Sequence, residues 1–281
     1  MMVSALIAIV AAVPLRSAVA ADLPYTKAPP MVAVAYNWTG FYLGANVGAA
    51  VSRSDPSTTA AVLPNLALSY FQPTDIPALQ AAGTRSIKST GFTGGLTTGY
   101  NWQVSNYVVG LEADFNYFGA KGTTTGSSIY AGFAAGPTIT TSTASDWLLT
   151  LRPRAGFLVT PALLLYGTAG LAVADLRARF NFTDNFPTAA GGATESASIS
   201  TTRAGWTAGA GGEYALPNGW SLKAEYLYVD LGRATTTSAN LVSATFGRLP
   251  GNVFTQSTSL HANIARVGFT HKWGDAVIAN Y

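Results

Sequence analysis

Apolar and polar side chains alternate along residues 149–157 of the chain. One face of this stretch is apolar and carries Leu149, Leu151, Pro153, Ala155 and Phe157. The other face carries Thr150, Arg152, Arg154 and Gly156. A period of two is the period of a β-strand, whose successive side chains point to opposite sides. In a soluble sheet, the apolar face would contact a core and the polar face would contact water.

Further segments repeat this alternation, with an apolar set on one face and small or charged residues on the other. The eight predicted strands cover residues 40–49, 92–103, 107–117, 147–157, 163–173, 206–214, 220–228 and 263–273. Each is close to the roughly 9–11 residues that a tilted strand needs to cross a bilayer. No helices are predicted that could cover the apolar faces, and a closed sheet in lipid leaves no backbone group unpaired. The alternation therefore predicts a transmembrane β-barrel.

The connections between the predicted strands alternate in length. Three are short, at residues 104–106, 160–161 and 215–219, and the last two contain turn-forming residues. The other four run to roughly 25–40 residues rich in Thr, Ser, Ala and Gly, which is typical of the outer loops of outer-membrane barrels. The expected fold is all-β: an eight-stranded antiparallel up-and-down transmembrane β-barrel with short periplasmic turns and long extracellular loops.

All charged side chains within the predicted strands have the inward parity. They are Glu112, Asp114, Arg152, Arg154, Glu213, Lys223, Glu225, Arg266 and Lys272. A charge on the lipid face at mid-bilayer would cost about 2–4 kcal/mol, so a barrel requires this one-sided placement. Unpaired charges would also be costly inside a barrel that is narrow enough for side chains to fill. We interpret the set as an internal ion-pair network; the alternative is that these charges line a path for ions or solutes.

Tryptophans lie on the outward face, near the strand ends. They are Trp102, Trp147, Trp206, Trp220 and Trp273. An amphipathic ring suits the headgroup level, so we assign them to the membrane interface. Trp38 has the opposite parity, and we expect it to precede the first strand or to flank a bulge. Leu164, Leu227 and Ile264 also point inward, so the interior is not wholly polar.

The composition agrees with a barrel better than with a soluble enzyme. Of the 281 residues, only 10% are charged and 29 are glycine, and the mean hydropathy is +0.25. Yet no stretch has the roughly 20 apolar residues of a spanning helix. The net charge of +3 is not gathered into a block, so we expect no nucleic-acid partner.

The N-terminus has the features of a secretory signal. An apolar run is followed by the small-x-small cleavage site Ala18-Val19-Ala20. No Lys or Arg precedes the run, which leaves a translation start upstream of Met1 open. We predict a signal peptide at residues 1–20, a periplasmic N-terminal linker at residues 21–37 and the outer-membrane β-barrel at residues 38–281.

Patterns for catalysis and metal binding are weak in this chain. The two histidines, His261 and His271, have no Cys or clustered carboxylates beside them, so we expect neither a metal site nor a cofactor. The glycine-rich stretch at residues 209–212 lies inside an alternating segment and opens no helix, which argues against phosphate binding. No nucleophile has an obvious partner, so we expect no catalytic residues and no enzyme.

Motifs distributed along the predicted strands resemble a known family. They are Trp38-Thr-Gly-Phe-Tyr-Leu-Gly-Ala-Asn-Val-Gly48, Leu111-Glu-Ala-Asp-Phe115, Leu165-Tyr-Gly-Thr-Ala-Gly170, Gly205-Trp-Thr-Ala-Gly-Ala-Gly211, Lys223-Ala-Glu-Tyr-Leu-Tyr228 and Arg266-Val-Gly-Phe-Thr-His-Lys-Trp273. In this order they resemble the small porin-like outer-membrane β-barrel proteins of Gram-negative bacteria, which are opacity-type surface antigens akin to the OmpA membrane domain. The resemblance covers most of the chain and fails in the long loops. Such barrels usually end on an aromatic residue, whereas residues 274–281 follow Trp273 here, so either Trp273 or Tyr281 is the candidate assembly signal.

The resemblance implies a protein of the bacterial outer membrane with roles in envelope integrity and surface display. Some relatives act as porins or haem binders, so a narrow porin for ions or small solutes is the alternative function. A receptor for a loop ligand or haem is the third, with Tyr70, Phe71, Phe133 and Phe254 as its only loop residues of interest. The expected partners are outer-membrane lipid, lipopolysaccharide and the barrel-assembly machinery. Both a monomer and a homo-oligomer stay open.

Overall fold

The structure is a computed structural model that describes residues 36–63, 69–186 and 191–273. The predicted signal peptide, residues 21–35 of the predicted linker and the tail at residues 274–281 lie outside the described residues. The fold below belongs to the compact unit Val34–Tyr281.

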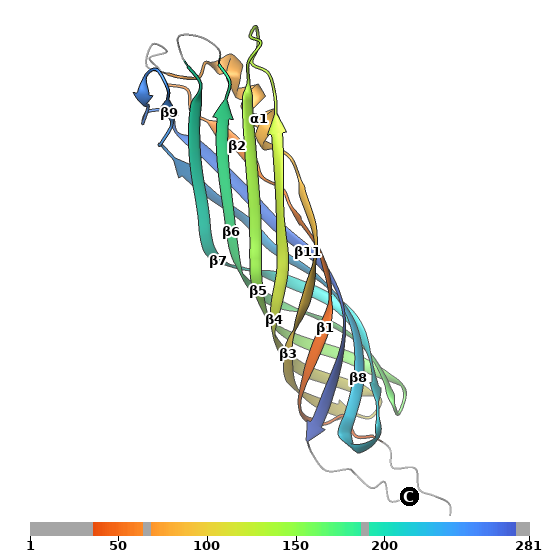
Figure 1. The fold of residues 1–281 in the computed structure, drawn as a ribbon. Coiled ribbons are helices and arrows are strands. Elements are labelled where there is room, and N and C mark those ends of the chain that lie inside the picture. Colours follow the sequence, from red (N-terminus) through yellow and green to blue (C-terminus); the bar gives the residue numbers. More distant parts are fainter. Residues whose placement is uncertain (1–35, 64–68, 187–190, 274–281) are drawn as a thin grey trace, which may run out of the picture. The chain divides into compact units, whose positions relative to one another are not determined.

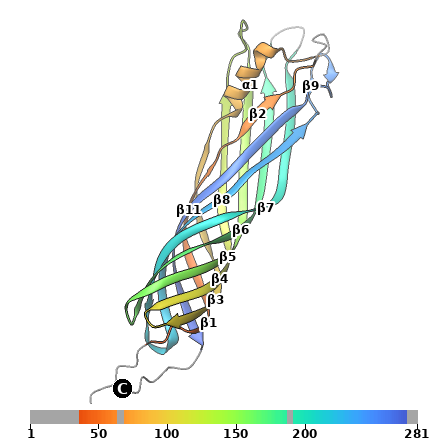
Figure 2. The same ribbon diagram turned by 180° about the vertical axis from the view of Figure 1, so that it is seen from behind.

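Eight long antiparallel strands form a closed ring (Figure 1, Figure 2). They are β1 (Gly40–Ser54), β3 (Ile87–Val104), β4 (Tyr107–Ser127), β5 (Pro137–Thr160), β6 (Leu163–Asp184), β7 (Ala193–Ala215), β8 (Trp220–Ser238) and β11 (Phe254–Trp273). Each strand pairs with the next in this order, and β11 pairs with β1, which closes the ring. The predicted eight-stranded antiparallel barrel is confirmed.

Shorter elements occupy the longer connections. β2 (Ser57–Ala60) pairs with β11, and β9 (Val242–Ser243) pairs with both β7 and β10 (Gly247–Arg248). The helical turns are η2 (Pro73–Asp75), α1 (Ile76–Gly83) and η3 (Pro217–Gly219). We call the end of the barrel with the short β3–β4, β5–β6 and β7–β8 connections the turn end, and the other the loop end. No helix in the described ranges is long and apolar enough to cross a membrane.

The strands extend well beyond the predicted segments at the loop end. They run from 15 residues in β1 to 24 residues in β5. Only residues 128–136 separate β4 from β5, where the sequence predicts a connection from residue 118 to residue 146. Three of the four predicted long loops are therefore much shorter than expected, because the strands continue into them, whereas the connection of β1 to β3 stays long at residues 55–86.

The reason for the longer strands is an inversion of polarity, and β6 shows it clearly. Up to Val173 the outward side chains of β6 are apolar, and beyond it they are Asp175, Arg177, Arg179, Asn181 and Thr183. The inward side chains change in the opposite sense and become Ala174, Leu176, Ala178, Phe180 and Phe182, all of them buried. The alternation itself never breaks. Beyond Val173 the barrel is therefore built like a water-soluble one, with its core inside.

The same inversion divides the whole barrel into two parts. The apolar band is the part on the turn side of the inversion, and the distal half is the rest. The last outward positions of the apolar band are Val51, Phe92, Tyr117, Trp147, Val173, Trp206, Tyr228 and Asn263. Irregularities in β4 and β5, between Tyr117 and Ala120 and between Ala144 and Leu148, lie near this level.

In the distal half, β7 and β8 separate. Their last paired residues are Trp206 and Asp230, and Gly232 then adopts a positive φ of 65° at a register shift of β8 against β11. Glycine takes this conformation without steric cost, so the bulge bends β8 away from β7. Ser238 donates across the resulting seam to the carboxylate of Glu195, and two further side chains donate across it to backbone carbonyls. Arg203 Nη2 donates to Arg233 O at 2.7 Å, and Asn240 Nδ2 donates to Ser196 O at 2.8 Å.

The seam predicts uneven hydrogen exchange along β7. Because the N–H and C=O of one residue point to the same side of a strand, the N–H groups of Ser198, Ser200 and Thr202 face the seam, as Ser196 O does. We expect these amides to exchange roughly a hundredfold faster than those of Ile199 and Thr201, which face β6. Hydrogen-exchange NMR on the folded protein in lipid nanodiscs measures this difference. Equal protection of the two sets would mean that β7 and β8 pair through the distal half.

Candidate functional site

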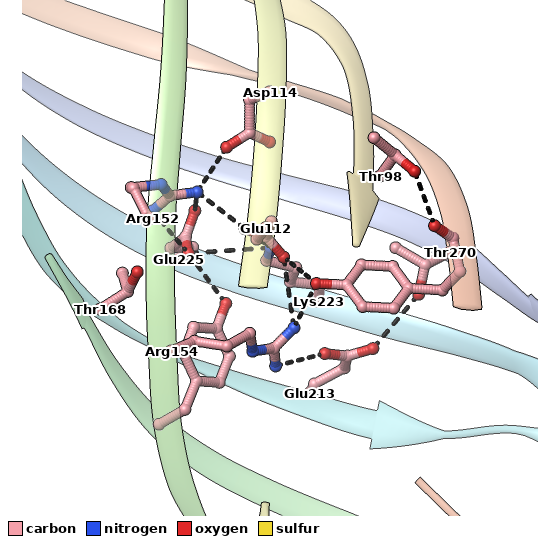
Figure 3. A network of polar contacts seen from close by, with 12 residues as sticks. Thr98, Glu112, Asp114, Arg152, Arg154, Thr168, Glu213, Lys223, Glu225 and Thr270 are labelled. Atoms are coloured by element: carbon pink, nitrogen blue, oxygen red, sulfur yellow. Dashed lines mark hydrogen bonds and ion pairs between the residues drawn. The ribbon is translucent and has the colours of Figure 1, made fainter. Parts of the chain in front are cut away.

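Inward charges from five strands of the ring meet inside the apolar band (Figure 3). The period of two places Glu112 and Asp114 of β4, Arg152 and Arg154 of β5, Glu213 of β7, Lys223 and Glu225 of β8, and Arg266 of β11 on the inner face. All of them are buried. The structure thus brings together eight of the nine charges of the sequence-predicted set, four acidic and four basic.

Arg152 occupies the centre of this charge network. Its Nη2 lies 2.7 Å from Glu112 Oε1 and 2.5 Å from Asp114 Oδ2, and its Nη1 lies 3.2 Å from Glu225 Oε1. The side chain is 0% exposed. One guanidinium therefore neutralises carboxylates on two different strands, β4 and β8.

Arg154 holds the part of the network nearest the turn end. Its Nη2 lies 2.7 Å from Glu213 Oε2, and its Nη1 lies 3.2 Å from Glu112 Oε2. The guanidinium carbon also sits 3.9 Å from the centre of the Tyr166 ring, which adds a cation–π contact. Tyr42 accepts a further hydrogen bond from Nη1 at 3.1 Å. Arg154 is thus fixed on several sides.

The remaining cations close the network. Lys223 Nζ lies 2.6 Å from Glu112 Oε2 and Arg266 Nη2 lies 3.8 Å from Glu112 Oε1, so Glu112 contacts all four cations of the network. Arg266 Nη2 pairs closely with Glu225 and lies 3.0 Å from Asp114 Oδ2. Every carboxylate of the network has at least one cationic partner, which is the condition for burying charges at tolerable cost.

Lys272, the ninth residue of the predicted set, lies toward the turn end. Its Nζ donates to Thr39 O at 3.2 Å and lies 5.6 Å from the centre of the Tyr36 ring. Both partners precede β1. Lys272 therefore contacts the segment that enters the barrel.

The sequence interpretation missed the hydroxyl groups that complete the network. Tyr42 donates to Glu112 Oε2 at 2.7 Å, and Tyr166 donates to Glu225 Oε1 at 3.0 Å. Ser221 donates to Glu213 Oε1 at 2.6 Å. The only signal in the sequence was their inward parity, since a phenol or hydroxyl in an alternating segment does not by itself indicate a carboxylate partner.

Trp38 closes the turn end of the interior. It precedes β1, as predicted, and is only 1% exposed, packed with Val108, Leu164 and Tyr166. Its indole Nε1 donates to Pro161 O at 3.1 Å, so the polar edge of the ring is satisfied as well. The opposite parity of Trp38 thus reflects a side chain that points into the barrel and does not face lipid.

An apolar layer covers the network on its other side. It consists of inward side chains from seven strands and contains Ala50, Phe118, Ala120, Leu148, Ala172, Ala174, Leu176, Ala178, Phe180, Ile199, Leu227, Val229, Leu231, Ala234, Leu260, Ala262 and Ile264. The inward-pointing Leu227 and Ile264 belong to this layer. The charges are consequently enclosed between two apolar clusters, one around Trp38 and this larger one.

A third apolar cluster fills the loop end. Phe71 packs edge-on against Phe182 and Phe254 with ring centres 5.7 and 5.5 Å apart, and Leu79 of α1 joins them. Tyr70 donates to Asp184 Oδ2 at 2.8 Å, and burial of Asp184 raises the pKa of its carboxyl. Of the loop aromatics considered for a ligand, Tyr70, Phe71 and Phe254 thus pack together. Phe133 is half exposed and contacts Phe186.

A narrow crevice lies beside the network. Its walls include Asn46, Thr97, Lys223 and Arg266, and it encloses about 210 Å³ between atoms. That space is spread so thinly that no position admits a water-sized sphere. Thr97 Oγ1 faces it without a hydrogen-bond partner among the described residues. This gap in the charged layer is therefore too tight for a continuous water column.

The tryptophans assigned to the interface lie at the two edges of the apolar band. Trp102, Trp220 and Trp273 lie near the turn end, and about half of each side chain is exposed. Trp147 and Trp206 lie at the inversion, where Trp147 stacks on Phe115 with ring centres 6.2 Å apart. His271 packs between Trp220 and Trp273, with ring centres 4.9 and 4.6 Å away.

Comparison with known proteins identifies the family. The family model described as outer membrane protein beta-barrel domain matches residues 8–260. The chain belongs to this family of outer-membrane β-barrels. The protein is accordingly an outer-membrane protein of a Gram-negative bacterium. Barrels of this class hold their apolar band in the lipid and their longer connections outside the cell.

The similar proteins are named as outer-membrane proteins, and several are named as immunogenic. The 31 kDa outer-membrane immunogenic protein of Brucella melitensis is 36% identical over 280 residues, which cover 97% of this chain and 100% of that protein. The 22 kDa outer membrane protein of Rhizobium leguminosarum is 33% identical over 50% of this chain and 53% of its own length. OprG from Pseudomonas aeruginosa matches in structure with a TM-score of 0.42 and 14% identity, over 84% of this chain and 98% of that one.

Proposed function

We propose that this protein is a non-enzymatic, non-conducting barrel that contributes to the integrity of the outer membrane and displays its distal half at the cell surface. The observation that carries the proposal is the closed interior. The Trp38 cluster, the ion-paired charge network and the apolar layer succeed one another along the barrel axis. A solute that crosses the barrel would have to displace side chains of all three layers. In the network, ion pairs with several cations hold the carboxylates in place.

The proposal is tested by single-channel conductance of the folded protein in planar bilayers. We expect a silent bilayer from protein whose folding is checked by heat-shifted gel mobility. Arg154→Ala removes an inner charge, and Arg177→Ala removes an exposed outward one as the matched control. Reproducible steps in the unmodified protein that change with Arg154→Ala and not with Arg177→Ala would establish the porin alternative instead.

The contribution to envelope integrity has its own test. Deleting the gene is expected to increase sensitivity to detergent and the release of membrane vesicles. The reason is that a closed barrel with tryptophans at both edges of its apolar band spans the bilayer without forming a pore in it. Complementation with the unmodified protein or with Arg177→Ala is expected to restore resistance. Unchanged detergent sensitivity and vesicle release after deletion would remove this part of the proposal.

A further inference from the structure

The seam between β7 and β8 leaves two strand edges without backbone partners. β7 pairs with β8 only as far as Trp206 and with β9 only at Ala193 and Thr194, so residues 195–205 have no partner strand on the seam side. On the other edge, residues 233–238 of β8 pair with β11 alone. Between these limits, the described part of the distal half is an open sheet.

Side chains bridge the seam at its two ends and leave its middle open. Arg203 donates to a carbonyl of β8 at the end nearest the apolar band, and Asn240 donates to a carbonyl of β7 at the loop end. We call the part between these contacts the open stretch; it consists of residues 197–202 of β7 and residues 234–237 of β8. On β7 it extends over roughly 20 Å.

The bridge at Arg203 shows that the two edges lie further apart than paired strands do. Strands that pair directly are roughly 4.8 Å apart, and their backbones bond with no side chain between them. At Arg203, a guanidinium side chain and a hydrogen bond of 2.7 Å lie between the two backbones. Such a separation is of the order of two strand spacings, roughly 9.6 Å, which is what one additional strand requires.

The two faces of the open stretch differ in polarity. On the inner side, Ile199 of β7 and Ala234 of β8 belong to the apolar layer, and Ala197 packs against it. Thr201 has the same inward parity as Ile199, yet its side chain is exposed, so the inner side is accessible through the seam. The exposed side chains on the outer side are hydroxyls: Ser198, Ser200, Thr235 and Thr237. A strand that fits between β7 and β8 must therefore alternate apolar and polar residues.

Free backbone groups face the seam from both strands. Ser196 O and Arg233 O accept side-chain hydrogen bonds across it, which fixes the phase of each strand. Because the N–H and C=O of one residue point to the same side, every second residue from these two presents both groups to the seam. In the open stretch these residues are Ser198, Ser200 and Thr202 of β7 and Thr235 and Thr237 of β8. An extended chain between the strands would thus meet main-chain donors and acceptors on both sides.

The open stretch lacks the residues that protect the edges of natural sheets. Edge strands are guarded by proline, by lysine and other charged side chains, or by a covering helix or loop. Residues 197–202 and 234–237 contain only Ala, Ser, Ile and Thr. Isoleucine and threonine are β-branched and favour strands. Nothing in this composition opposes the addition of a strand.

We propose that the open stretch binds an extended segment of another polypeptide, which adds as one strand between β7 and β8. The segment alternates apolar and polar residues, so that its apolar side chains pack against Ile199 and Ala234 and its polar side chains face water. It runs antiparallel to one neighbour and parallel to the other, because β7 and β8 run in opposite directions. Main-chain hydrogen bonds provide affinity, and the alternation provides specificity. The inference is independent of whether the barrel conducts.

The test is hydrogen-exchange NMR on the folded, full-length protein in lipid nanodiscs, titrated with a short peptide in which valine and threonine alternate. Peptide binding is expected to slow exchange of the Ser198, Ser200 and Thr202 amides at least roughly tenfold, because each N–H gains an acceptor. The amides of Ile199 and Thr201, which face β6, are expected to keep their rates. Two control peptides are expected to change none of these rates: one has its valines and threonines in separate blocks, and one is N-methylated at alternate residues.

Lysine substitutions at two neighbouring residues test the assignment of the faces. Thr201→Lys places a charge on the inner side, against the apolar side chains of the added strand, and is expected to weaken peptide binding roughly tenfold. Thr202→Lys, the matched control, places the same charge on the outer side and is expected to change binding by less than roughly twofold. Both residues are exposed, so neither substitution buries a charge in the free barrel. Circular dichroism and heat-shifted gel mobility establish that each variant is folded.

Several outcomes would overturn the inference. One is unchanged exchange of the Ser198, Ser200 and Thr202 amides at millimolar peptide. Another is exchange of these amides that is as slow as that of Ile199 before any peptide is added, because the seam would then be closed. Equal slowing of both sets of amides, equal effects of the control peptides, or equal weakening of binding by Thr202→Lys would likewise exclude strand addition at this seam.

Discussion

Arg152→Met is expected to destabilise the barrel by about 3–5 kcal/mol, because breaking a buried ion pair leaves an uncompensated charge. Arg152 contacts carboxylates of Glu112, Asp114 and Glu225, and its side chain is fully buried. Methionine keeps the length of the side chain and removes the charge. Urea unfolding in lipid vesicles, followed by tryptophan fluorescence, measures the free energy of unfolding.

Arg177→Met is the matched control for this prediction. Arg177 also has two carboxylate partners, but it lies in the distal half with 46% of its side chain exposed. Exposed pairs contribute about 0–1 kcal/mol, so the loss should be small. Adding Asp114→Asn to Arg152→Met should recover part of the stability, since one buried negative charge is then removed. Equal losses for Arg152→Met and Arg177→Met would show that water reaches the network.

The ion pairs of the network link several strands and therefore affect strand register. Glu112 alone contacts cations from β5 and β8, and Asp114 contacts cations from β5 and β11. Sliding one strand by a residue would turn its charge toward the lipid, and sliding it by two would separate the charge from its partner. The network therefore favours one register around the ring, in addition to any net stability that it provides.

The sequence predicts the apolar band well because lipid imposes a strict rule there. Any outward charge is costly, so parity alone separates Arg152 and Arg154 from Leu151 and Pro153. The same parity places the charged side chains on the inner face. It does not give their height along the axis, which depends on strand register and on irregularities such as the one between Ala144 and Leu148. Parity therefore identifies the members of the network and leaves their pairing open.

The distal half is harder to predict because its polarity is reversed. Along β6 the alternation continues, with Leu176, Phe180 and Phe182 on one face. If the apolar face is assumed to point outward, however, the residues around Arg177 and Arg179 resemble a polar loop instead of a strand. The period-two signal of a strand was present, but the polar residues lie on the outward face and the apolar residues on the inward face. Trp38 is a different case, since it lies outside any strand and its burial depends on contacts with β4, β6 and the β5–β6 turn that are distant in the sequence.

Arginine substitutions along β6 are expected to locate this reversal directly. Leu171→Arg places a charge on the outward face inside the apolar band and should cost about 2–4 kcal/mol, falling toward the interface. Asn181→Arg places the same side chain on the same face ten residues further on, among other exposed polar groups, and should change the free energy of unfolding by less than about 0.5 kcal/mol.

Truncating apolar side chains of β6 should give the opposite order. Phe180 is fully buried in the distal half, so Phe180→Ala should cost about 3–5 kcal/mol through lost packing. Leu171 is 45% exposed in the barrel, and its side chain contacts lipid both in the folded barrel and in the unfolded chain adsorbed to the membrane. Leu171→Ala should therefore cost less free energy of unfolding than Phe180→Ala. If Asn181→Arg proved as damaging as Leu171→Arg, the lipid would extend past the inversion, and the cations at Arg177 and Arg179 would lie within the bilayer. The pair of arginine variants thus tests where the apolar band ends and the distal half begins.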